Sequence, residues 1–355
     1  MQTERRERHP YHMHDAILAQ PEAFVRAVGR NEEAVEGFVR EAVGSSRLFL
    51  AGLGTSHHAA QVGEHLMRAY GGGVDARAVN SFDLALYGPE LSAEDCVIAV
   101  SHRGSKRYTA RALERAREAG CRTALVTGES ASVSVPADVV FETVPQERSP
   151  AHTVSYTSAV AVLASIAGKV GRHRTGGEAL NDDVLREMVP AALRAALDTE
   201  DRAEGLAREH TGRRRIWLVG GGPSAVTAQE VALKIKETSY LQAEGMPTET
   251  MLHGPFQCVE AEDLFVLAAP SGAARERTLE VAELAREVGA PCVTLGDEPA
   301  ADLAVPGVPE PFSALTCLVP LQFFSYHLAR SRGTNPDSFR AEDPRFARAD
   351  VSGRL

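Results

Sequence analysis

The sequence predicts an α/β fold with two tandem αβα sandwich domains, each built around a parallel sheet. Three observations support this prediction. The chain repeats itself once, short apolar runs alternate with helical patterns, and 44% of its 355 residues are hydrophobic. A chain of this length holds roughly two domains of common size. Apolar runs without polar alternation suit strands that are buried on both faces, and the order strand–helix–strand implies a parallel sheet.

The internal repeat rests on two pairs of segments. R-L-F-L-A-G-L-G-T-S at 47–56 matches R-I-W-L-V-G-G-G-P-S at 215–224, which begins 168 residues later. The segment 97–120 matches 266–289 without a gap, at an offset of 169. Two matches at nearly one offset are hard to obtain by chance. Because there are only two copies, we expect tandem domains and not a solenoid.

The expected elements follow from the apolar runs. The strands expected are 48–51, 96–100, 123–127 and 139–143 in the first copy, and 216–219, 264–268 and 293–295 in the second. The expected helices are two within 15–43 that break near 29–31, one at 106–119, and a polar helical connection at 181–210. The domain boundaries follow as an N-terminal helical segment 1–44, a first domain 45–175, a linker 176–209, a second domain 210–340 and a tail 341–355.

Charge and cysteine content narrow the class of protein. The formal charge of −10 argues against a nucleic-acid or anionic-membrane binder, although a local basic pocket can still hold an anion. The five cysteines have no zinc-finger or redox spacing, so we expect a reduced, cytoplasmic protein in which most of them are buried. We expect neither a signal peptide nor a membrane span, because no apolar run is long enough. The paired histidines His57 and His58 point apart on a helix, so we expect no metal.

Two loops after strands of the first copy carry phosphate-binding chemistry. G-L-G-T-S at 52–56 offers Gly54, Thr55 and Ser56, and S-H-R-G-S-K at 101–106 offers Ser101, His102, Arg103, Gly104, Ser105 and Lys106. Ligands of parallel sheets lie at the carboxyl ends of strands, where backbone N–H groups at a helix start suit a phosphate. The alternative is that Ser56 and Ser105 only cap helices and that the two cations are solvated. Neither loop has a nucleotide-binding fingerprint.

The segment 231–245 and the H-G-P at 253–255 carry acid–base chemistry. The sequence V-A-L-K-I-K-E-T-S-Y-L-Q-A-E-G places Lys234 and Glu237 on one expected helix, and His253 follows sixteen residues after the glutamate. A carboxylate and an imidazole can move protons on a small substrate. A solvated charged helix face is the alternative. We expect the residues between 243 and 255 to form a long polar loop.

At these motifs the chain resembles the sugar isomerase (SIS) family, in particular the isomerase half of glucosamine-6-phosphate synthase, and the resemblance covers most of the chain. It is carried by M-H-D-A-I-L-A-Q-P at 13–21, G-L-G-T-S, E-R-S-P-A-H-T-V-S-Y-T at 147–157, the helix with H-G-P, and Y-H-L-A-R-S-R-G-T-N-P-D at 326–337. The resemblance implies flavodoxin-like domains, a sugar-phosphate substrate, no cofactor and a homodimer with shared active sites.

The resemblance also implies roles for single residues. Ser56, Ser101 and His102 would lie at the sugar phosphate, and Pro150 and Ala151 would offer backbone groups to the sugar. Glu237, with Lys234 beside it, would be the base that moves a proton between C1 and C2. His253 would open the sugar ring and would come from the partner subunit.

Three departures from the family pattern matter. The sequence has no glutaminase domain, so we expect no ammonia from glutamine. The family's S-x-S-G-x-T becomes S-H-R-G-S-K, with Arg103 and Lys106 in place of a serine and a threonine, and Pro344 falls where a catalytic lysine usually lies. We therefore expect an isomerase or deaminase of an aminosugar or ketose phosphate. The alternative is a non-catalytic sugar-phosphate sensor, and the retained Glu237 and His253 favour the enzyme.

Overall fold

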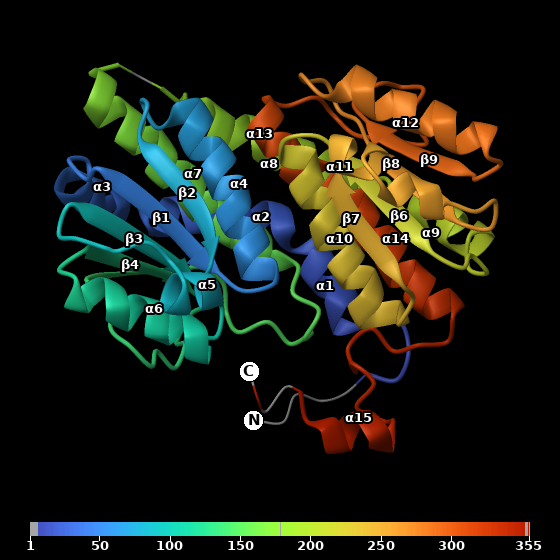
Figure 1. Cartoon of the computed structure of the whole chain (residues 1–355), viewed down its shortest axis with the longest axis horizontal. Helices are drawn as coiled ribbons and strands as arrows, with labels where there is room; N and C mark the ends of the chain where they lie inside the picture. The colour runs from blue at the N-terminus through green and yellow to red at the C-terminus, as the bar shows by residue number, and fades with distance from the viewer. Residues whose placement is uncertain (1–5, 178, 352–353, 355) are drawn as a thin grey trace. The chain divides into compact units, whose positions relative to one another are not determined.

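The computed structural model describes residues 6–177, 179–351 and 354, and its contacts divide the chain into two compact units. Unit 1 comprises Met1–Ala19, Arg148–Thr153 and Ala191–Arg348, and unit 2 comprises Gln20–Glu147, Val154–Pro190 and Ala349–Leu355. Each unit contains one five-stranded sheet in which every pair of neighbouring strands is parallel (Figure 1). The predicted α/β fold with two parallel sheets is confirmed.

The sheet of unit 2 has the strand order β2-β1-β3-β4-β5. Its strands are β1 (Arg47–Gly52), β2 (Asp75–Asn80), β3 (Asp95–Val100), β4 (Arg122–Thr127) and β5 (Val139–Glu142). Helices α5 (Ser81–Leu86) and α6 (Arg107–Glu118) cover one face, where Phe49 and Val97 pack against Leu84 and Ala112. Buried strands β1 and β3 alternate their side chains between this face and the opposite one, so both carry apolar runs.

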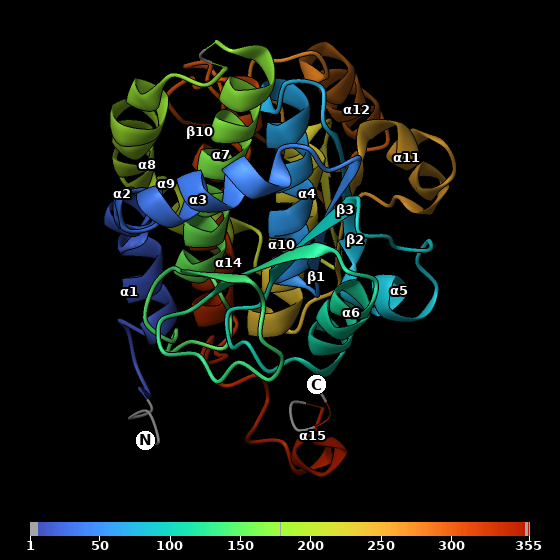
Figure 2. The same ribbon diagram turned by 90° about the vertical axis from the view of Figure 1, so that its left-hand side faces the viewer.

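The opposite face of this sheet is covered by a group of packed helices. They are α2 (Gln20–Arg30), α3 (Glu32–Ala42), α4 (Thr55–Tyr70), α7 (Val154–Thr175) and the π-helical turn Val184–Met188. Helices α4 and α7 lie side by side, as Figure 2 shows. A Cβ on Gly171 of α7 would lie 1.9 Å from the carbonyl oxygen of Tyr70, so the two helices approach closely only because this residue is glycine.

The sheet of unit 1 has the order β7-β6-β8-β9-β10, which repeats the order in unit 2 strand for strand. Its strands are β6 (Ile216–Gly220), β7 (Ala243–Pro247), β8 (Leu264–Ala268), β9 (Cys292–Gly296) and β10 (Leu303–Ala304). The helices of unit 1 are α1 (His12–Leu18), α9 (Glu200–Glu209), α10 (Pro223–Ser239), α11 (Thr248–Leu252), α12 (Arg275–Glu287), α13 (Glu310–Thr316), α14 (Leu318–Ser331) and α15 (Pro344–Ala349). Helix α8 (Val189–Leu197) connects the units along the chain.

One ion pair occurs at equivalent positions of both units. Arg47 binds the buried carboxylate of Asp95 through two contacts of 2.7 Å, and Arg215 binds Asp263 at 3.1 and 2.8 Å. Arg47 and Asp95 begin the first and third strands of unit 2, and Arg215 and Asp263 directly precede the first and third strands of unit 1. The duplication predicted from the sequence therefore extends to the contacts that join neighbouring strands.

The structure corrects several expected elements. Two helices were expected within 15–43, and the structure has three, with the break at Asn31 in the expected place. The long polar loop expected at 243–255 is wrong, because it contains the edge strand β7 and helix α11. Strands β2, β7 and β10 were missed. Edge strands contact a neighbour on one side only, so their sequences do not need a continuous apolar run.

Two stretches, Val154–Thr175 and Glu310–Ser331, are long and apolar enough to cross a membrane by composition alone. Their most apolar windows are 89% and 100% buried inside the protein. These stretches are therefore core helices of the two units. The expected burial of most cysteines also holds for Cys96, Cys121 and Cys317, whereas Cys292 is half-buried and Cys258 is exposed.

Candidate functional site

The two loops expected to bind phosphate follow adjacent strands of unit 2. Strand β1 pairs with β3 along its length, so both loops begin at the same edge of the sheet. A Cβ on Gly52 would lie 2.4 Å from the backbone of Ser56, and Gly54 has a φ of 54°. Only glycine fits both positions without strain. The turn places Thr55 and Ser56 in the first turn of α4, where both are half-buried.

The second loop is held rigidly and presents an unsatisfied hydroxyl group. Thr127 donates its hydroxyl to the carbonyl of Ser101 at 2.8 Å, and Gly128 donates its N–H to the carbonyl of His102 at 2.9 Å. Ser101 is 3% exposed, and its Oγ has no hydrogen-bond partner among the residues that the structure describes. A buried hydroxyl without a partner is costly, so this position favours a ligand that accepts from it.

Arg103 and Lys106 add positive charge to the same loop. Neither side chain forms an ion pair or hydrogen bond within the described part of the chain. The pKa of Lys106 is lowered, first by burial and then by the nearby charge of Arg103. A bound anion would offset both effects, because an opposite charge favours the protonated amine.

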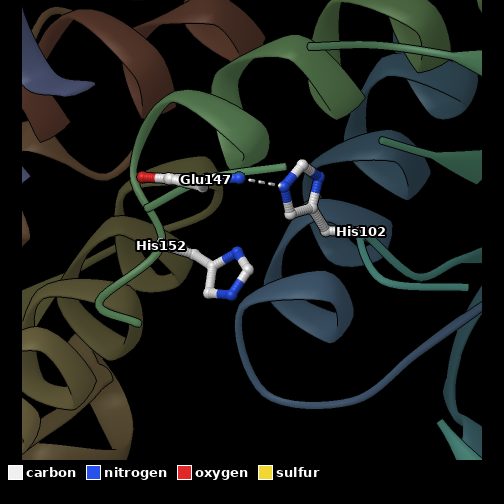
Figure 3. Close-up of side chains that lie close together, drawn as sticks. All are labelled: His102, Glu147 and His152. Carbon is white, nitrogen blue, oxygen red and sulfur yellow. Dashed lines mark hydrogen bonds between the residues drawn. The ribbon is translucent and has the colours of Figure 1, made fainter. Parts of the chain in front are cut away.

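The loop also carries the imidazole of His102, and one hydrogen bond fixes its tautomer. The backbone N–H of Glu147 donates to Nε2 of His102 at 2.9 Å (Figure 3). Nε2 therefore carries no proton, and the neutral ring carries its proton on Nδ1. The carboxylate of Glu147 accepts the N–H of Ser155 at 3.1 Å, at the start of α7. The motif at 147–157 does not indicate these two hydrogen bonds of Glu147, one through its backbone N–H and one through its carboxylate.

The equivalent loop of unit 1 is filled by the protein's own carboxylates. Ser271 donates its N–H to Asp297 at 2.8 Å, and Ala273 donates its N–H to Glu310 at 3.1 Å. A Cβ on Gly272 would lie 2.2 Å from the Glu310 carboxylate, so that carboxylate rests directly on the loop. Arg275, which occupies the position of Lys106, pairs with Glu298 at 2.8 Å. This copy of the loop binds internal anions, whereas its counterpart in unit 2 has unpaired cations.

The predicted acid–base residues lie on one face of α10 in unit 1. Lys234 donates to Glu237 at 2.6 Å, and its Nζ lies 3.5 Å from the carboxylate of Glu230. The side chains of Lys234 and Glu230 are almost completely buried, and that of Glu237 is 22% exposed. The spacing of three and four residues brings the side chains together on a helix. Glu230 was not among the site residues predicted from the sequence. Its position four residues before Lys234 is the spacing at which side chains meet on a helix.

The tail after α14 packs against the end of the same helix. Thr334 donates its hydroxyl to the carbonyl of Thr238 at 2.8 Å, and Arg340 donates its backbone N–H to the hydroxyl of Tyr240 at 2.8 Å. Pro344 begins α15 and is exposed. The sequence contains four lysines, and none of them follows Lys236. The tail therefore offers no lysine that could take the place of the family's catalytic lysine.

His253 does not bind Glu237 in the described chain. It follows α11, its side chain is 77% exposed, and its Nε2 lies 3.2 Å from Glu249. That carboxylate also binds Arg277 at 2.6 Å. The exposed position agrees with a histidine that completes the site of another subunit, and this role stays a prediction. The expected role of Pro150 and Ala151 in offering backbone groups to the sugar also stays a prediction. Both residues belong to the segment Arg148–Thr153 of unit 1.

The family model named SIS domain matches residues 43–167 and 211–332, one match in each copy of the repeat. The glutamine–fructose-6-phosphate aminotransferase (isomerizing) of Pyrococcus horikoshii is 28% identical over 330 residues, covering 90% of this chain and 55% of that protein. This chain therefore spans about half the length of the curated relatives it matches.

Solved structures share the same fold. The C-terminal domain of glucosamine-fructose-6-phosphate aminotransferase from Francisella tularensis superimposes with a TM-score of 0.82, at 19% identity, over 93% of this chain and 98% of that chain. Tagatose-6-phosphate ketose/aldose isomerase from Escherichia coli superimposes with a TM-score of 0.77, at 20% identity, over 96% of this chain and 98% of that chain. At this level of identity the likeness establishes the fold.

Proposed function

This chain belongs to the SIS domain family, and we propose from that membership that it is an enzyme acting on a sugar phosphate. The reaction is isomerisation or deamination of an aminosugar or ketose phosphate. The loops at 52–56 and 101–106 hold the phosphate, and Glu237 moves the proton. We further propose a cytoplasmic homodimer that requires no cofactor and binds neither nucleic acid nor membranes.

The contrast between the two copies of the second loop is the observation that carries this proposal. In unit 1 the loop amides and the loop cation are satisfied by Asp297, Glu310 and Glu298. In unit 2 the loop cations Arg103 and Lys106 have no partner in the described chain, and the Ser101 hydroxyl is buried without one. A loop that binds carboxylates in one copy and lacks them in the other favours an external anion in the second case.

The chemistry follows from the environment of Glu237. Its partial exposure leaves the carboxylate accessible to a substrate, while the hydrogen bond from Lys234 holds its orientation. A carboxylate in this position can move a proton between C1 and C2 of an open-chain sugar, from C1 to C2 in a ketose and from C2 to C1 in an aldose. The absence of a lysine after Lys236 favours isomerase or deaminase chemistry over the synthase reaction of the longer relatives. The tagatose-6-phosphate isomerase likeness supports a ketose phosphate as one substrate class.

Binding is tested with a panel of sugar phosphates and their unphosphorylated forms, by calorimetry or thermal shift. Arg103→Ala should weaken phosphosugar binding about 10- to 150-fold, because one charge-assisted hydrogen bond contributes roughly 1.5–3 kcal/mol. The combined Arg103→Ala and Lys106→Ala variant should bind still more weakly. Arg111→Ala with Arg117→Ala is the matched control, since both arginines are exposed on α6. Equal affinities in the two double variants would refute the phosphate site.

Turnover is tested on the sugars that bind. Glu237→Gln keeps the side-chain shape and removes the base, so the rate should fall about 10²–10⁴-fold. Affinity for the sugar phosphate should stay near that of the wild type. Glu244→Gln, at an exposed carboxylate of β7, is the control. If the wild type binds sugar phosphates and turns none of them over, the sensor alternative replaces the enzyme.

A further inference from the structure

A basic cavity lies beside the N-terminal segment of unit 1, and none of its lining residues belongs to the proposed phosphate loops. It has a volume of about 430 Å³, and its charged or titratable lining residues are Arg6, Glu7, Arg8, His9, His12 and Arg148. The lining therefore contains three arginines and one glutamate, in a chain whose formal charge is −10. A local positive region on an acidic protein concentrates anions from solution.

The wall of the cavity is fixed by contacts with the body of unit 1. The side chain of Asn335 donates to the carbonyl of Arg6 at 2.9 Å, and Nδ1 of His9 lies 2.7 Å from the hydroxyl of Tyr326. The carboxylate of Asp337 accepts the backbone N–H of His12 at 2.7 Å. The segment that carries Arg6 and Arg8 is therefore held against the rest of the folded unit.

The charges of this lining are not balanced inside the protein. Arg6 binds Asp15 at 2.7 Å and donates to the carbonyl of Pro10 at 2.9 Å. Arg8 and Arg148 form no ion pair and no side-chain hydrogen bond with any described residue. The pKa of His9 is lowered, first by partial burial and then by Arg330, so His9 adds little charge at neutral pH. The positive charge available to a ligand comes from the two unpaired guanidinium groups.

We propose that this cavity is a binding site for a small dianion, held between Arg8 and Arg148. The volume falls in the range of about 300–1,000 Å³ that ligand pockets occupy. Guanidinium groups bind phosphate and carboxylate oxygens in pairs, so both a phosphate ester and a dicarboxylic acid present the required chemistry. No lining residue of this cavity belongs to the proposed sugar-phosphate loops, and Arg148 precedes Pro150 and Ala151, which are expected to offer backbone groups to the sugar.

Calorimetry on the full-length protein tests this site with two probes, inorganic phosphate and succinate. We compare the wild type with Arg8→Ala/Arg148→Ala, with Arg103→Ala/Lys106→Ala, and with the control Arg26→Ala/Arg111→Ala, which removes two exposed arginines elsewhere. The wild type and the control should bind phosphate at two sites per chain. Each of the other variants should weaken one of the two sites, about tenfold or more for a lost charge-assisted contact.

The outcomes separate this inference from the proposed function. Loss of cavity binding for phosphate alone identifies a phosphate ester as the ligand, and loss for succinate alone identifies a dicarboxylate. If Arg8→Ala/Arg148→Ala binds both probes as the control does, the cavity is not an anion site and the inference fails, whatever happens at Arg103 and Lys106. Arg8→Lys/Arg148→Lys keeps the charge and loses paired contacts, so intermediate affinity is expected. Circular dichroism checks that each variant is folded.

Discussion

Lys234 brings a charge into the interior of unit 1, where the carboxylates of Glu230 and Glu237 flank its ammonium group. An isolated buried charge is strongly unfavourable, and two neighbouring carboxylates offset that cost. The arrangement keeps Glu237 at one orientation, because its Oε2 receives a 2.6 Å hydrogen bond from a side chain that cannot move into water. A single buried lysine thus links the stability of α10 to the geometry of the proposed base.

Replacing Lys234 by methionine should destabilise the protein strongly. The change preserves most of the side-chain volume but leaves the buried carboxylate of Glu230 without its cation, and breaking a buried pair in this way costs roughly 3–5 kcal/mol. Lys236→Met, two residues away on the exposed face, should change the free energy of unfolding by only about 0.5 kcal/mol. Urea unfolding measures both. Adding Glu230→Gln to Lys234→Met should recover part of the loss, and no recovery would contradict the pairing.

Individual site residues could be predicted where a motif fixes the local geometry. Lys234 and Glu237 share a helix face because of their spacing, and the structure brings them together as expected. Glu230 needed knowledge of burial, because an exposed glutamate at the same spacing has the same sequence pattern. The internal carboxylate of Glu310 comes from a segment far along the chain from Gly272, and no local pattern indicates such a contact.

At the scale of elements, α4 and α7 approach each other at a glycine. A methyl group on Gly171 would lie 1.9 Å from the carbonyl oxygen of Tyr70, far inside van der Waals contact. Gly37 in α3 is also within a helix, but nothing lies within 4 Å of the same position. Both glycines therefore lie in helices, but only Gly171 lacks the space for a side chain.

Alanine substitutions at these two glycines should change stability in opposite directions. Gly37→Ala should stabilise the protein by about 0.4–1 kcal/mol, because alanine reduces the conformational freedom of the unfolded chain. Gly171→Ala should destabilise it by roughly 1–3 kcal/mol, since the helices must separate to relieve the overlap. Thermal unfolding of the two variants and the wild type measures both effects. A stabilising Gly171→Ala would show that the packing of α4 on α7 yields easily.

The elements predicted from sequence are those with the strongest apolar runs. The three strands central to each sheet were found because burial on both faces leaves a continuous apolar run. Strands β2 and β7 were missed because D-A-R-A-V-N and A-E-G-M-P mix charged and small residues. Each lies at a sheet edge, where neighbouring strand contacts rather than apolar composition fix the conformation.

At the scale of the whole molecule, the exposure of His253 leads to a prediction about assembly. If His253 opens the sugar ring in the partner's site, Glu237→Gln and His253→Ala chains each form inactive dimers on cyclic substrates. Mixing the two after mild dissociation should restore activity, because a mixed dimer contains one site with both groups intact. Turnover of the mixture is compared with that of each variant alone. A stable, fully active monomer in sedimentation, or no gain on mixing, would contradict the shared site.

The pH dependence of stability should reflect buried histidines in both units. The pKa values of His57, His210 and His327 are all lowered, and burial is the largest cause in each case. For His327 the neutral form is also required by geometry. Its Nδ1 accepts from Arg330 at 2.8 Å, while its Nε2 donates to Glu200 at 3.0 Å. Protonation of Nδ1 would remove the first bond and place two cations together, with Glu200 at 3.0 Å and Glu204 at 3.8 Å as the carboxylates that would offset the added charge.

The folded and unfolded states bind protons differently at these histidines, and this difference sets the direction in which pH changes stability. The unfolded chain binds protons at these imidazoles near their ordinary pKa of about 6.5, whereas the folded protein resists protonation to lower pH, so acid favours unfolding. This contribution to stability should be fully present above pH 7 and should decline as the pH falls below about 6.5. Urea unfolding at pH 7.5 and 5.5 measures the loss. His327→Gln should reduce the difference between the two pH values, whereas His253→Gln, at an exposed ring, should leave it unchanged. Equal pH dependence in both variants would show that His327 does not contribute.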